Sequence, residues 1–121
     1  MRHLKKKHHL SRQPDARRAL IKNLASSLVS SGHVVTTRAK ARAVVPFIDR
    51  LFSRAKKSTP HELKRLAQQS LTTREIQRQF VTSWVPATKD RASGFTRMTK
   101  IGYRKGDNAE RVRLEMIDSP K

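Results

Sequence analysis

The first twelve residues of the chain contain no acidic side chain, and this absence constrains strongly what they can fold into. They contain five Lys or Arg and three His, and the first acid of the chain is Asp15. Apart from Met1, Leu4 and Leu10 are their only large apolar residues. A segment this cationic cannot build a core of its own, so we expect residues 1–13 to form an extended basic arm that lies against a polyanion.

The rest of the chain is also strongly basic. It carries 28 Lys and Arg against 9 Asp and Glu, a net charge of +19 over 121 residues. Repulsion on this scale destabilises a compact chain unless a partner supplies counter-charge. Residues 1–57 hold 15 basic and 2 acidic side chains, whereas residues 58–121 hold 13 and 7. The N-terminal half is therefore predicted to make the densest contacts with an anionic partner.

Composition limits the class of protein further. Hydrophobic residues make up 36% of the chain, which predicts a small domain with a thin core over residues 14–118 and a short tail over 119–121. No apolar run approaches the ~20 residues of a membrane span, and the arm lacks the apolar region of a secretory signal. The absence of Cys excludes disulfides and thiolate metal sites and suits a reducing compartment.

Apolar periodicity and capping signals predict the order helix, strand, three helices and β-hairpin. Helices are expected over residues 14–31, 38–57, 60–69 and 73–84, and strands over 33–37, 95–103 and 109–117. Pro46 is expected to kink or split the second helix after Val45. Thr37 is expected to cap that helix, and two capping boxes, one from Thr59 to Glu62 and one from Thr72 to Glu75, are expected to open the next two.

These elements predict an α+β protein in which helices pack on a three-stranded mixed sheet as a two-layer domain. The final strand should be half-buried, because Val112, Leu114 and Met116 alternate with charged residues. Which strand of the hairpin neighbours residues 33–37 is not decided by the pattern.

Catalysis is not indicated. The acids are few and scattered, and Glu62 and Glu75 are better explained as capping groups than as an acid and base. All four Gly stand at predicted breaks or in the hairpin, so no phosphate-binding loop is present. His3, His8 and His9 lack a nearby carboxylate or Cys, so neither a metal nor another cofactor is expected.

Nucleic-acid binding through phosphates is the function that the residues favour. Most aromatic residues fall on apolar helix faces and are expected in the core, whereas Tyr103 is a candidate for contact with a base or sugar. The predicted contacts form two groups, on the arm with the first helix and on the hairpin: Arg2, His3, Lys5, Lys6, Lys7, Arg12, Arg17, Arg18 and Lys22, and then Arg97, Lys100, Arg104 and Lys105.

Particular residues along nearly the whole chain carry a family resemblance. It begins with Met1-Arg2-His3 and continues through Lys22-Asn23 and Thr36-Thr37. It is strongest in the hairpin, at Gly94, Thr96-Arg97, Lys100, Gly102, Arg104 and Gly106-Asp107-Asn108-Ala109. On these residues the chain resembles the bacterial large-subunit ribosomal protein L17 family.

The resemblance implies a structural protein of the large ribosomal subunit in the bacterial cytoplasm. It further implies binding to large-subunit rRNA near the mouth of the peptide exit tunnel, with ribosomal protein L32 as a neighbour. Neither a small-molecule substrate nor a homo-oligomer is expected. A free nucleoid-type DNA-binding protein stays open as an alternative, because the charge permits it, although no DNA-reading motif or oligomerisation stripe is evident.

Overall fold

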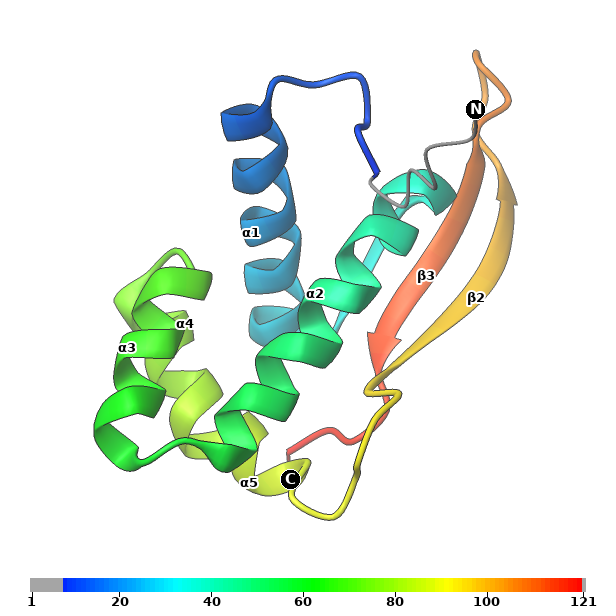
Figure 1. The fold of residues 1–121 in the computed structure, drawn as a ribbon. Helices are drawn as coiled ribbons and strands as arrows, with labels where there is room; N and C mark the ends of the chain where they lie inside the picture. Colours follow the sequence, from blue (N-terminus) through cyan, green and yellow to red (C-terminus); the bar gives the residue numbers. More distant parts are fainter. Residues whose placement is uncertain (1–7, 121) are drawn as a thin grey trace, which may run out of the picture.

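The structure, a computed structural model, describes residues 8–120 and places helices on one face of a small sheet (Figure 1). The helices are α1 Pro14–Ser31, α2 Arg38–Lys57, α3 Pro60–Ser70, α4 Arg74–Gln79, a π-helical segment Phe80–Trp84 and α5 Val85–Ala87. The strands are β1 His33–Thr37, β2 Thr96–Tyr103 and β3 Glu110–Met116. The predicted α+β class and element order are confirmed.

The sheet is antiparallel throughout, so the prediction of a mixed sheet was wrong. Its strand order is β1-β3-β2, and β3 pairs antiparallel with both neighbours. A parallel pair would have required β1 to lie beside β2. The observed register instead sets Val34 opposite Leu114, which points the half-buried Val34 side chain to the same side of the sheet as the core residue Leu114.

The alternation predicted for β3 is confirmed. Val112, Leu114 and Met116 are buried under the helices, whereas Arg111 and Arg113 on the opposite face are exposed. One sheet face therefore packs on the core and the other stays open.

Aromatic rings from three separate segments meet in the core. The Phe52 ring of α2 packs edge-on against Phe80, with 5.1 Å between ring centres, and stacks on Phe95 at 5.2 Å. All three side chains are fully buried. These contacts hold α2 against the π-helical segment and the start of β2.

The helix α2 runs without a break from Arg38 to Lys57, so of the two outcomes predicted for Pro46, a kink or a split, the split was wrong. Proline removes the hydrogen bond that its nitrogen would donate to the carbonyl four residues earlier, at Arg42. Both Pro46 and Arg42 are exposed, so water can solvate that carbonyl. The buried face on either side of Pro46, from Val44 to Ile48, keeps the helix continuous.

The predicted helix ends are partly confirmed. Gly32 ends α1 in the left-handed conformation, and the capping box of Thr59 and Glu62 is present. Thr37 stands at the start of α2 but its side chain makes no capping hydrogen bond. The second box is wrong, because α4 starts one residue later than predicted and Thr73 is the residue that caps it, accepting from the Ile76 N–H.

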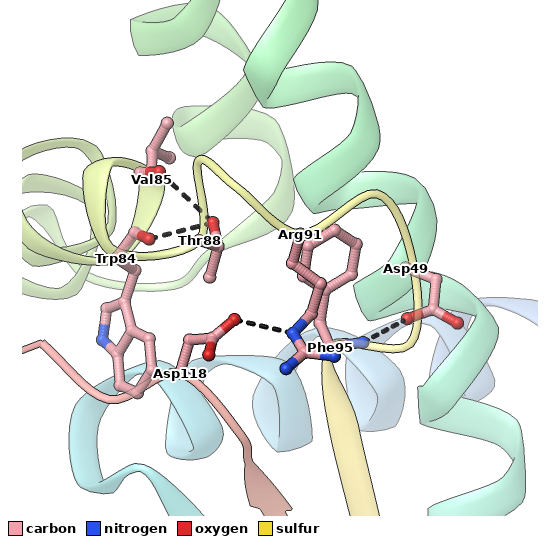
Figure 2. Close-up of polar contacts among 7 residues, drawn as sticks. All are labelled: Asp49, Trp84, Val85, Thr88, Arg91, Phe95 and Asp118. Carbon is pink, nitrogen blue, oxygen red and sulfur yellow. Dashed lines mark hydrogen bonds and ion pairs between the residues drawn. The ribbon is translucent and has the colours of Figure 1, made fainter.

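Polar contacts tie the loop before β2 to the rest of the fold (Figure 2). Arg91 Nε donates to Asp118 Oδ2 at 2.7 Å, and the Phe95 N–H donates to Asp49 Oδ1 at 3.4 Å. The buried Thr88 hydroxyl donates within its own helix end, to the Trp84 carbonyl at 3.1 Å. The loop is thereby connected to α2 and to the segment after β3.

The Trp84 indole should contribute measurably to stability. Its Nε1–H donates to the Val29 carbonyl at 2.8 Å, and that carbonyl belongs to the last turn of α1, where no helical donor is available. Trp84→Phe should lower the free energy of unfolding by about 1–3 kcal/mol in urea denaturation, because the acceptor is left buried and unpaired. Tyr103→Phe, which removes a hydroxyl from an exposed ring, is the matched control and should change stability little. Equal effects of the two variants would contradict this role.

Candidate nucleic-acid interface

Eight of the predicted binding residues lie in the described part of the chain, and they fall into two groups. Arg2, His3, Lys5, Lys6 and Lys7 lie outside the described residues. The first group, here called the helix surface, consists of Arg12, Arg17, Arg18 and Lys22. The second, here called the hairpin surface, consists of Arg97, Lys100, Arg104 and Lys105. Figure 1 shows the β2–β3 turn at the same end of the molecule as the first turns of α1 and α2.

Few acidic side chains lie near the helix surface. Arg18 lies 3.8 Å from Asp15, but the two side chains are 82% and 99% exposed, so water screens this pair strongly. Arg17 donates from Nη1 to His9 Nδ1 at 3.1 Å and to the His9 carbonyl at 3.5 Å. The Arg17 contact holds the end of the arm against α1, while Arg12 is exposed just before the helix.

The hairpin surface is different, because acids lie among its cations. Arg97 lies 3.9 Å from Glu115, Lys100 lies 3.5 Å from Glu110, and Arg104 pairs with Asp107. Of its four cations, Lys105 alone has no carboxylate within 4 Å among residues 8–120.

Two further cations share these acids: Arg38 at the start of α2 pairs with Glu110 at 3.2 Å, and Arg113 pairs with Glu115 at 3.3 Å. The hydrogen bond from Arg38 is the main cause that lowers the pKa of Glu110, and Lys100 adds to it. Glu110 therefore holds α2 to the hairpin as an ionised group. The hairpin cations must exchange these internal partners in order to bind an external anion.

Tyr103 is exposed on the hairpin, and its hydroxyl accepts from Lys100 Nζ at 3.2 Å. The same ammonium lies 5.0 Å from the centre of the ring. The hydrogen bond with Tyr103 is the main cause that raises the pKa of Lys100. An aromatic face and a cation are thus presented together to solvent.

A groove between α1 and α2 adds residues that the sequence analysis did not select. It has a volume of about 720 Å³. Its cationic lining comprises Arg17, Arg18 and Arg50, and its apolar lining comprises Ile21, Ala43, Pro46 and Phe47.

Phe47 was expected in the core but is only half-buried, because it stands at the edge of the α2 face. The sequence did contain a signal for this groove: Pro46 and Arg50 stand one helical turn apart and therefore lie on one side of α2.

Residues 8–120 contain no cluster of three or more His, Cys, Asp or Glu that could hold a metal ion. No helix in the same range is long and apolar enough to cross a membrane.

The fold and its surfaces define a small basic α+β protein that carries one group of cations at the start of α1 and another on the hairpin. Residues 20–117 match the family model described as ribosomal protein L17. The chain is 41% identical over 117 residues to large ribosomal subunit protein bL17 of Gemmatimonas aurantiaca, covering 97% of this chain and 98% of that protein. It is 39% identical to the bL17 of Chloroflexus aurantiacus, covering 97% and 100%, and 36% identical to that of Flavobacterium johnsoniae, covering 98% and 72%. The chain belongs to the ribosomal protein L17 family.

In the hairpin turn, the ion pair with Arg104 should set the pH at which the Asp107 carboxylate titrates. The hydrogen bonds from Arg104 and from the Ala109 N–H lower the pKa of Asp107 from 3.8 to about 2. Because the folded-state pKa is depressed, the carboxylate supports the turn above its ordinary pKa, and this support is lost as pH falls through about 2.

Carboxyl carbon NMR of the Arg104→Ala variant should show the Asp107 midpoint moved up towards its ordinary value. Lys105→Ala is the control, since it removes a neighbouring charge and leaves the hydrogen bonds intact. An unchanged midpoint in Arg104→Ala would refute the assignment.

Proposed function

We propose that this chain is a structural protein of the large ribosomal subunit that binds large-subunit rRNA and stabilises its tertiary packing. Membership of the L17 family supports the ribosomal part of the proposal, and its relatives are named as large-subunit proteins. The observation that carries the rRNA part is the distribution of charge. Residues 8–57 hold 11 Lys or Arg and only 2 Asp, and the helix surface lies within them.

The helix surface is the stronger candidate for phosphate contacts. An exposed ion pair contributes about 0–1 kcal/mol, so the acids near the hairpin hold their cations only weakly but still compete with phosphate. Among residues 8–120, the one ion pair that the helix surface has to give up is Arg18–Asp15. Neutralising phosphates where RNA segments converge lowers their mutual repulsion and favours one packed arrangement.

The arm extends the same surface in this proposal. Arg2, His3, Lys5, Lys6 and Lys7 would follow the rRNA away from α1, while Arg97, Lys100, Arg104 and Lys105 would contact a second segment. The family resemblance supports a position near the peptide exit tunnel, with L32 as a neighbouring protein. Since the contacts are mainly to phosphate, the chain would read RNA shape more than sequence.

Removing charge from the helix surface should weaken rRNA binding and reduce its salt dependence. For the double variant Arg17→Ala and Arg18→Ala, the slope of log affinity against log salt concentration should flatten by about two, one for each lost phosphate contact. Filter binding to large-subunit rRNA over a salt series measures this slope.

The double variant Lys64→Ala and Arg65→Ala removes the same charge from the exposed side of α3 and serves as the matched control. Its slope should stay close to that of the unchanged protein. Equal slopes for the two double variants would contradict the proposed surface, and tighter binding to duplex DNA than to rRNA would favour a nucleoid protein.

A further inference from the structure

The lining of the α1–α2 groove combines apolar side chains with cationic ones. All six aromatic residues of the chain lie in residues 8–120, and four of them are fully or almost fully buried. Tyr103 and Phe47 are the two rings that keep exposed surface, and Phe47 lines the groove beside Ile21. An aromatic ring at the wall of an open groove can stack with another flat ring.

The cationic side chains of the groove favour an anion. Its lining includes Arg17, Arg18 and Arg50, together with His8. The one acid in the lining is Asp49, and its Oδ1 already accepts from the Phe95 N–H at 3.4 Å. Arg50 Nε donates to the Pro46 carbonyl at 3.3 Å, which keeps this guanidinium along α2 beside the groove.

The groove has room for an organic ring. Its volume of about 720 Å³ lies within the usual range of small-molecule sites, about 300–1,000 Å³. A ligand that suits these residues presents the flat face of a ring to Phe47 and carries negative charge next to it, and a nucleotide has both. Proteins recognise unpaired RNA bases by stacking them on aromatic rings and guanidinium planes.

We propose that the α1–α2 groove binds an unpaired base of the large-subunit rRNA, with the base on Phe47 and the adjoining phosphate at the arginines that line the groove. This inference rests on the proposed function, since it assumes that rRNA is the partner. It adds a base contact to a surface otherwise expected to touch phosphate. An acidic peptide is the other occupant that the charge would suit, and the test separates the two.

The test is chemical probing of large-subunit rRNA bound to the full chain. Dimethyl sulfate and a 2′-hydroxyl acylating reagent should reveal one or two unpaired nucleotides that the unchanged protein protects. Phe47→Leu keeps an apolar side chain but removes the ring, so these nucleotides should regain reactivity. The dissociation constant should rise roughly 3- to 10-fold, with an unchanged salt slope, because no charge is lost.

Two further variants keep the result interpretable. Arg50→Ala, at an exposed position, should restore reactivity at the same nucleotides even if Phe47→Leu lowers stability. Tyr103→Leu removes the exposed ring of the hairpin, outside the groove, and should leave those nucleotides protected.

Unchanged protection in both Phe47→Leu and Arg50→Ala would overturn the base site while leaving rRNA binding intact. That result would leave the groove to a partner such as an acidic peptide. If the unchanged protein did not bind the rRNA at all, the proposed function itself would fail, and the base site with it.

Discussion

The fold depends on packing one face of β3 against the helices. Val112, Leu114 and Met116 are buried on this face, and the core continues through Val44, Ile48 and Phe52 of α2. A chain with 36% hydrophobic residues can cover only one face of its sheet in this way. The apolar side chains are therefore gathered between two layers, and the cations are left on the outer sides of the helices, on the hairpin and on the open face of the sheet.

This separation of apolar and charged surface explains how so basic a chain keeps a defined core. Acids are placed where cations would otherwise crowd: Glu110 lies between Arg38 and Lys100, and Glu115 lies between Arg97 and Arg113. Around the first half of α1 the balance is different, and Asp15 is the one acid paired there in the described residues. Repulsion on this side of the molecule is best relieved by a polyanion, which connects the folded core to the function we propose.

Much of the fold could be predicted because local signals and burial agree. A few neighbouring residues specify each of three features: the end of α1 at Gly32, the capping box that starts at Thr59, and the alternation along β3. The errors concern tertiary context. Pro46 does not split α2 because it lies on the exposed side of a helix whose other face is packed in the core, and β1 pairs with β3 in a register that no local pattern specifies. The sequence predicted the cations of the site. It did not predict the acid partners of the hairpin cations, which depend on strand pairing, or the partial exposure of Phe47, which depends on how α1 and α2 meet.

Sucrose-gradient sedimentation of a cell lysate, first at moderate and then at high salt, tests the central claim most directly. We expect the chain to migrate with the large ribosomal subunit in a one-to-one ratio and to stay there at high salt, because many cooperative contacts hold an integral protein in the subunit. Migration with chromosomal DNA, or recovery at the top of the gradient at moderate salt, would contradict a structural role in the subunit.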